Sequence, residues 1–303
     1  MSKTKNTRFS VAVLLAFSCC FVSTCKATSV VILVSRHGIV LGADGKATFT
    51  ATGQKQRISG ATTHQKIFFL NRSIAIAHAG FEAMSISAVG GKHLQTAREY
   101  FSVGQFIQDV QKRTSPVFTT SKVADILKDV LTNKFSDLDL MLKSGSIKRG
   151  DIPAPHDVLT QFYVAGYEGQ SARVYNVLVE IDWRTLTHNI PVVTLYPGQR
   201  RNLSFNWIGG RERGIIELLD QNSAVLKQAV SAMPEEMTAL QGDLDLGVPR
   251  MLTLAYGLLV IEVRRNPQSV GFPLTIATVA PDQRVDIQTY KPESCVKRHG
   301  IRL

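Results

Sequence analysis

Thr28 is the clearest candidate for a reactive residue in this chain, because a pattern typical of secretory cleavage lies directly before it. Residues 1–8 are polar and basic, residues 9–22 are apolar except for Ser10 and Ser18, and the small residues Cys25 and Ala27 follow. This order is typical of a secretory signal peptide. Cleavage after Ala27 would give Thr28 a free α-amine. With a pKa of about 7.7–8.0, such an amine can accept the proton of the threonine hydroxyl and make it a nucleophile.

The N-terminal segment has two other interpretations. An uncleaved anchor would use the same apolar stretch, but its 14 residues are short for a transmembrane helix. A lipoprotein signal would place Cys25 at the cut, but residues 22–24 lack the Gly or Ala usual before such a cysteine. We therefore predict that residues 1–27 are a cleaved signal peptide and that the mature protein is secreted or periplasmic. Cys295 would then be the remaining cysteine, and one thiol forms no internal disulfide.

The sequence after Ala27 carries a set of short motifs at defined spacing. They are Thr28-Ser29-Val30, Arg36-His37-Gly38, Gly42-Ala43-Asp44-Gly45-Lys46-Ala47-Thr48, Lys66-Ile67-Phe68-Phe69-Leu70 and Ala79-Gly80. Asp44 lies 16 positions after Thr28, and Lys66 lies 14 positions before Gly80. In these residues the chain resembles the proteasome β-subunit and bacterial HslV family of N-terminal nucleophile hydrolases. The resemblance is good from residue 28 to about 98 and looser from 158 to 290.

The resemblance implies a role for each of five residues. Thr28 would be the nucleophile, with its own α-amine as the base. Lys66 would lie near the hydroxyl and favour the alkoxide, and Asp44 would pair with Lys66 and orient it. The backbone N–H of Gly80 would stabilise the oxyanion, and Ser269 would belong to the supporting set.

Taken alone, each of these residues has a plainer interpretation. Asp44 could be a strand-end residue and Gly80 a helix-entry glycine. Lys55, in a polar loop, is a rival to Lys66, which we favour because it directly precedes a hydrophobic strand. His78 is interpreted as a packing residue, with a position in the substrate pocket as the alternative.

Three positions depart from the family pattern. Family members carry a serine before their third helix, where this chain reads Ile208-Gly209-Gly210-Arg211 and has no hydroxyl. Asn266 stands in place of an aspartate, and an amide can form hydrogen bonds but carries no negative charge. Lys46 stands where many members have arginine. The change at Lys46 is the mildest of the three, whereas loss of the carboxylate at 266 would lead to slow catalysis, a changed substrate or no catalysis.

The elements that would position these residues alternate between strands and helices. The β-branched and apolar runs predict hairpins at 30–34 with 39–43 and at 66–70 with 73–79, and further strands at 161–167, 173–183, 187–195, 205–208, 272–279 and 284–290. Apolar periodicity predicts helices at 81–98, 121–142, 211–233 and 248–266, with polar loops at 50–65 and 145–157. This order predicts an α/β (α+β) fold, a four-layer α-β-β-α sandwich. Residues 28–303 are expected to form one domain.

The basic composition argues less for nucleic acid than it first suggests. The 303 residues carry a net charge of +11, but residues 1–27 hold four basic and no acidic residues. Their removal lowers the net charge to +7. The remaining Lys and Arg are scattered, and the densest patch, at 297–302, is a terminal tail. We therefore expect no nucleic-acid partner.

Together these features predict an exported, proteasome-like threonine endopeptidase that acts on peptides or unfolded polypeptides. The alternatives are a noncatalytic proteasome-fold subunit or binding module, and an amidohydrolase that acts on a non-peptide amide. No cluster of His, Cys and Asp has metal-ligand spacing, so we expect neither a metal nor a cofactor. The rings typical of the family make a homo-oligomer an expectation. Export away from cytosolic ATP argues against an ATP-dependent unfoldase partner.

Overall fold

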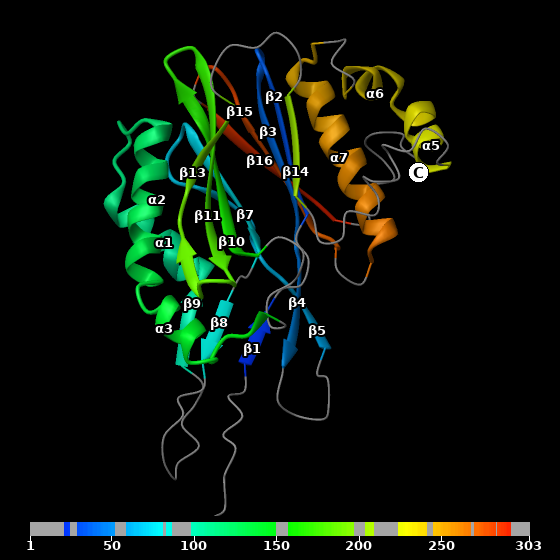
Figure 1. The fold of residues 1–303 in the computed structure, drawn as a ribbon. Coiled ribbons are helices and arrows are strands. Elements are labelled where there is room, and N and C mark those ends of the chain that lie inside the picture. The colour runs from blue at the N-terminus through cyan, green and yellow to red at the C-terminus, as the bar shows by residue number, and fades with distance from the viewer. Residues whose placement is uncertain are drawn as a thin grey trace, which may run out of the picture.

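Antiparallel strands dominate the described part of the chain, and helices lie beside two of its sheets (Figure 1). The computed structural model describes residues 21–24, 29–51, 59–80, 83–86, 98–149, 157–196, 204–208, 224–240, 245–267, 270–282 and 284–291. Within these ranges it contains six helices and three sheets. The predicted mixture of helices and strands is therefore confirmed.

One sheet contains the strand that begins two residues after Thr28. Its spatial order is β14 (Ser204–Ile208), β2 (Val30–Ser35), β3 (Gly38–Asp44), β15 (Leu274–Val279) and β16 (Val285–Tyr290). All neighbours are antiparallel, and β2 and β3 form the predicted hairpin. Every residue of β2 and β3 is buried, as expected for apolar strands that are covered on both faces.

A second antiparallel sheet carries the other predicted hairpin. Its order is β12 (Thr187–Asn189), β11 (Ser171–Asp182), β10 (Val158–Glu168), β7 (Ile74–Gly80) and β6 (Ile67–Phe69), and β13 (Val192–Tyr196) also pairs with β11. Most of the strands predicted in both sheets are confirmed to within a few residues at their ends. The strand predicted at 187–195 is instead divided into β12 and β13, which pair with different parts of β11, and Pro191, which has no N–H to donate, lies between them.

Two groups of helices flank these two sheets on opposite sides (Figure 1). The first group, α1 (Val103–Arg113), α2 (Thr120–Lys134) and α3 (Leu138–Lys143), shares an apolar core with β7, β10 and β11. The second, α5 (Ala224–Ala232), α6 (Pro234–Leu240) and α7 (Val248–Arg265), shares a core with β2, β3 and β15. α7 makes direct contacts with these three strands.

Alternation along β2 divides its side chains between two cores. Val31 and Leu33 belong to the cluster that contains α7, whereas Val30, Ile32 and Val34 pack with residues of the second sheet. Burial of each such side chain contributes roughly 1.5–3 kcal/mol. A slip of one residue would exchange the two sets, so the register of β2, and with it the position of the chain after Thr28, is strongly fixed.

A third sheet corrects two predictions. Its order is β5 (Ser59–Thr63), β4 (Lys46–Ala51), β1 (Phe21–Thr24), β8 (Ala83–Ile86) and β9 (Arg98–Ser102). The predicted loop at 50–65 therefore contains a strand, and residues 83–86 are a strand rather than part of a helix. A short apolar run fits either period, and here pairing of β8 with both β1 and β9 satisfies its backbone. β1 lies within the predicted signal peptide.

The predicted helix at 121–142 is divided at Phe135. Phe135 has φ −101° and ψ 18°, outside helical geometry, and both Phe135 and Leu138 are completely buried in the core beneath α2. The buried residues Leu131, Phe135, Leu138 and Leu142 keep helical spacing across the break, so the apolar pattern predicted one helix, whereas the chain turns at 135–137 and begins again as α3. The predicted helix at 211–233 is described from residue 224 onward, and α6 begins at Pro234, a residue suited to the first helical turn.

His188 links helix α3 to strand β12. Its backbone N–H and its ring Nδ1 lie 2.8 and 2.6 Å from Oδ1 of Asp139. Partial burial alone would raise the pKa of Asp139, but these hydrogen bonds outweigh burial and hold that pKa below its usual value. Folding therefore favours the ionised form of this carboxyl.

We expect His188→Ala to lower the free energy of unfolding by about 1 kcal/mol at about pH 6. The loss should shrink as the pH falls through about 4 and below, because a carboxyl with a lowered folded pKa stops contributing once it is protonated. Urea unfolding across this range measures both effects. Asp139→Asn, which cannot titrate, is the control. A loss in His188→Ala that stays constant down to about pH 2.5 would contradict this account.

Candidate functional site

A buried ion pair between Asp44 and Lys66 forms the centre of the candidate site. Asp44 is the last residue of β3, and Lys66 directly precedes β6. The Lys66 ammonium lies 2.9 Å from Oδ1 of Asp44, and both side chains are 0% exposed. Lys66 Nζ also donates to the backbone carbonyl of Lys46 at 2.7 Å. The structure thus brings together two of the predicted site residues, from different sheets.

The Asp44 carboxylate accepts hydrogen bonds from three backbone groups besides this lysine. Oδ1 accepts from the N–H of Ser29 at 2.8 Å, while Oδ2 accepts from Lys46 at 3.1 Å and from Gly271 at 3.2 Å. A buried carboxylate is stable only when its oxygens are satisfied in this way. Asp44 therefore ties three separate chain segments to the lysine.

Ser29 connects this network to Thr28. Ser29 is completely buried, and its N–H donates to the carboxylate oxygen that also pairs with Lys66. Ser29 directly follows Thr28 in the chain. The hydrogen bond to Asp44 therefore holds the backbone of Ser29, which follows the predicted nucleophile, close to the buried ammonium of Lys66.

Several residues of the sequence prediction lie outside the described part of the chain. They are Thr28, Lys55, Gly210 and Ser269, together with most of the predicted signal peptide. Their positions remain predictions. The two hydrogen bonds from Ser29 and Gly271 to Asp44 nevertheless fix described residues close in sequence to Thr28 and Ser269.

Gly80 ends strand β7, beside the strand that follows Lys66. Its φ of +106° is a conformation that residues with a side chain rarely adopt. A Cβ here would lie 2.8 Å from both the carbonyl oxygen of Leu159 and the Cα of Thr160. Two residues earlier, the N–H of His78 donates to the Lys66 carbonyl at 2.8 Å. Packing and backbone geometry therefore both require glycine at this end of β7.

His78 is enclosed in the protein core. Its ring is 0% exposed, Nε2 lies 2.9 Å from Oγ1 of Thr160, and the ring centroid is 4.9 Å from that of Phe162. Phe162 belongs to the apolar cluster beneath α1 and α2. These contacts agree with a packing role, and a position in a substrate pocket remains a prediction.

His64 is a neighbour of the ion pair that sequence reasoning missed. Its N–H donates to the carbonyl of Gly45 at 2.8 Å, which holds the segment before Lys66 against the chain after Asp44. Partial burial and the positive charge of Lys66 lower the pKa of His64. The charge of the buried ammonium therefore influences His64, which is partly exposed. The signal available in the sequence was the position of His64, two residues before the lysine.

The loop after α7 closes the other side of the network. Lys46 Nζ donates to the carbonyl of Pro267, and the N–H of Gly45 donates to the carbonyl of Gly271 at 3.1 Å. A Cβ on Gly271 would lie 2.9 Å from Cδ of Lys46. Lys46 thus anchors this loop, and Gly271 allows the close approach.

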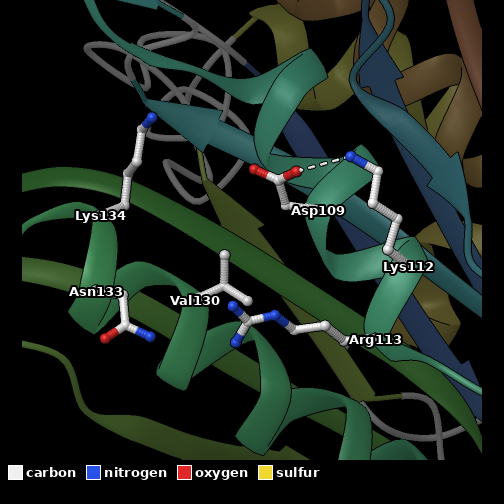
Figure 2. Close-up of a pocket in the computed structure, with 6 residues that line it drawn as sticks. All are labelled: Asp109, Lys112, Arg113, Val130, Asn133 and Lys134. Carbon is white, nitrogen blue, oxygen red and sulfur yellow. Dashed lines mark hydrogen bonds and ion pairs between the residues drawn. The ribbon is translucent and has the colours of Figure 1, made fainter.

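A separate pocket lies between helices α1 and α2, on the outside of the second sheet. Figure 2 shows the residues that line its volume of about 410 Å³, namely Asp109, Lys112, Arg113, Val130, Asn133 and Lys134. Lys112 pairs with Asp109 at 3.3 Å. The basic residues lie at the last turns of the helices, where they favourably oppose the helix dipoles. Helix stabilisation accounts for these charges without a ligand.

Comparisons with known proteins identify no relative of this chain at a significant level. No protein-family model matches the chain, and no curated protein matches it at a significant level. Among the described residues, no three His, Cys, Asp or Glu side chains are grouped closely enough to hold a metal ion. None of the helices in the ranges given above is long and apolar enough to cross a membrane.

Proposed function

We propose that this protein is an exported threonine hydrolase of the proteasome-like type, with Thr28 as its N-terminal nucleophile. The observation that carries the proposal is the shared carboxylate oxygen of Asp44. It accepts the N–H of Ser29 at 2.8 Å and pairs with the Lys66 ammonium at 2.9 Å. We further propose that the sheets and helices form the four-layer α-β-β-α sandwich of that family, with residues 28–303 as one domain.

In the proposed reaction, the α-amine of Thr28 accepts the proton from the threonine hydroxyl. The oxygen attacks the carbonyl of a peptide bond, the proton passes to the leaving amine, and an ester forms on Thr28. Water then hydrolyses this ester and regenerates the free hydroxyl. The Lys66 ammonium favours the alkoxide, and the Gly80 N–H would donate to the oxyanion, a contribution of roughly 3–4 kcal/mol in other hydrolases.

The proposed substrates are peptides and unfolded polypeptides. An exported enzyme has no access to cytosolic ATP, so it would act without an ATP-dependent unfoldase. A homo-oligomer, such as a ring, is part of the proposal, and light scattering coupled to gel filtration measures it. The proposal includes no metal, no cofactor and no nucleic acid.

The test is the N-terminus and reactivity of the purified mature protein. We expect N-terminal sequencing to begin at Thr28, and we expect a threonine-directed β-lactone or epoxyketone to give one covalent adduct on that residue. Thr28→Ala, which keeps the fold but has no hydroxyl, should give no adduct and a turnover at background, a loss of at least about 10³-fold. A different N-terminus, or a folded protein without an adduct, would refute the proposal.

One observation favours a noncatalytic protein of the same fold as the second candidate. Asn266, at the position where the family has an aspartate, directs its side-chain amide to Glu262. A site without the family's carboxylate could be retained for binding alone. The labelling experiment distinguishes the two, because a noncatalytic protein would fold but leave Thr28 unmodified.

A further inference from the structure

We propose that Glu262 is a positioning residue for the Asp44–Lys66 site and acts through Asn266. Glu262 lies in the last part of α7 and is 0% exposed. Its Oε1 accepts a hydrogen bond from Nδ2 of Asn266, the residue that caps the C-terminus of α7. The backbone N–H of Asn266 also donates to the Glu262 carbonyl at 2.8 Å. Both the side chain and the main chain of Asn266 are therefore held by the same helical residue.

Asn266 begins the loop that contacts the ion pair. Its carbonyl accepts the N–H of Val270 at 2.9 Å, and the next residue, Gly271, donates to Oδ2 of Asp44. Pro267, directly after Asn266, accepts the hydrogen bond from Lys46 Nζ. Three hydrogen bonds, joined by the covalent links within Asn266 and between Val270 and Gly271, therefore connect Glu262 to Asp44.

The chemistry of the contact fixes the orientation of the amide. In the contact observed, Glu262 Oε1 is the acceptor and Asn266 presents its NH₂ group, which leaves the amide oxygen to face other groups. An aspartate at 266 would instead place a second negative charge against Glu262. Asn266 therefore suits the carboxylate of Glu262, which lies one helical turn earlier. Asn266→Asp without a change at Glu262 should lower the stability of the protein.

This inference rests on the proposed function in one respect, namely that the Asp44–Lys66 pair belongs to the reactive site. The position of the loop can nevertheless be measured without substrate or inhibitor. Hydrogen exchange at the Val270 and Gly271 amides reports whether the loop is held against Asp44.

We expect Glu262→Ala to raise the exchange rate of these two amides by about 10-fold or more. Glu262→Gln, which keeps an acceptor oxygen, should stay within about 3-fold of the unsubstituted protein. Ile261→Ala, which removes a buried neighbouring side chain of α7, is the matched control and should not raise exchange selectively at this loop. The inference is overturned if Glu262→Ala leaves these amides unchanged, or if Ile261→Ala has the same effect on them.

Charge exchange between the two positions is the second measurement. Asn266→Asp should lower the apparent Tm at about pH 7 by roughly 4–8 °C, because two carboxylates then share one contact. The double variant Glu262→Gln with Asn266→Asp should recover to within about 3 °C of Glu262→Gln. An Asn266→Asp protein as stable as the unsubstituted one would overturn the inference.

Labelling separates this inference from the proposed function. If Thr28 reacts with the β-lactone, the labelling rate should fall in Glu262→Ala and be retained in Glu262→Gln, and equal rates in Glu262→Ala and the unsubstituted protein would contradict the positioning role. If Thr28 does not react in any variant, the proposed function fails. The exchange and thermal measurements then still decide whether Glu262 holds the loop.

Discussion

Asp44→Asn and Lys66→Met should each abolish covalent labelling of Thr28 and lower the free energy of unfolding by about 3–5 kcal/mol. The double variant, which carries both changes, should regain most of that stability and remain unlabelled. The physical reason is that both side chains are completely buried and pair at 2.9 Å. Removal of one partner leaves the other as an unpaired buried charge, whereas removal of both leaves none.

Stability and reactivity are measured separately for this prediction. Urea unfolding followed by circular dichroism gives the free energy of unfolding, and mass spectrometry gives the rate of adduct formation on Thr28. In the single variants a loss of labelling has two explanations, loss of the fold or loss of the ammonium. The stable double variant separates them, because it lacks the ammonium but keeps a folded core.

An exposed ion pair of the same residue types provides the matched control. Lys112 and Asp109 pair at 3.3 Å, with side-chain exposures of 70% and 40%. Lys112→Met and Asp109→Asn should each change the free energy of unfolding by less than about 1 kcal/mol, because water already solvates both charges. Labelling of Thr28 should be unchanged. A double variant at Asp44 and Lys66 that still labels Thr28 would show that the ammonium has no part in the reaction.

The pattern of residues predicted the central strands well because those strands are buried on both faces. The runs at 30–34 and 39–43 are β-branched and apolar, and such a composition is compatible with little except a covered strand. The same reasoning failed at residues 83–86, where a short apolar stretch fits both the helical and the strand period. Its pairing with β1 and β9 depends on residues far away in sequence, which a local pattern does not contain.

The candidate site was predictable where residue types and spacing define it, and not where tertiary contacts define it. The motifs around Asp44 and Lys66 predict that the two residues pair, and the structure places their side chains in contact. The sequence does not predict a role for Glu262, because a glutamate in an amphipathic helix is normally exposed and no motif marks it. Its complete burial against Asn266 arises from the packing of α7 on the sheet. A local sequence window does not specify that packing.

Gly80→Ala should reduce the labelling rate of Thr28 by roughly 10²–10³-fold, the usual cost of a lost oxyanion donor. The added methyl group would lie 2.8 Å from the Leu159 carbonyl oxygen and from Cα of Thr160, both backbone atoms that cannot move aside independently. The end of β7 must therefore shift away from β10. The N–H of residue 80 would shift with it, away from the proposed oxyanion position. Thermal unfolding should show a loss of about 2–3 kcal/mol in stability.

Gly169→Ala distinguishes this collision from backbone strain alone. Gly169, in the turn between β10 and β11, also has a positive φ, of +62°, but a Cβ there would meet no atom within 4 Å. It should therefore cost only about 1 kcal/mol of stability and leave the labelling rate unchanged. If both variants label Thr28 at the unsubstituted rate, the Gly80 N–H does not serve the oxyanion. If only Gly80→Ala lowers the labelling rate of Thr28, the close approach of β7 to β10 orients the Gly80 N–H toward the oxyanion. Glycine at the end of β7 is then required for catalysis as well as for packing.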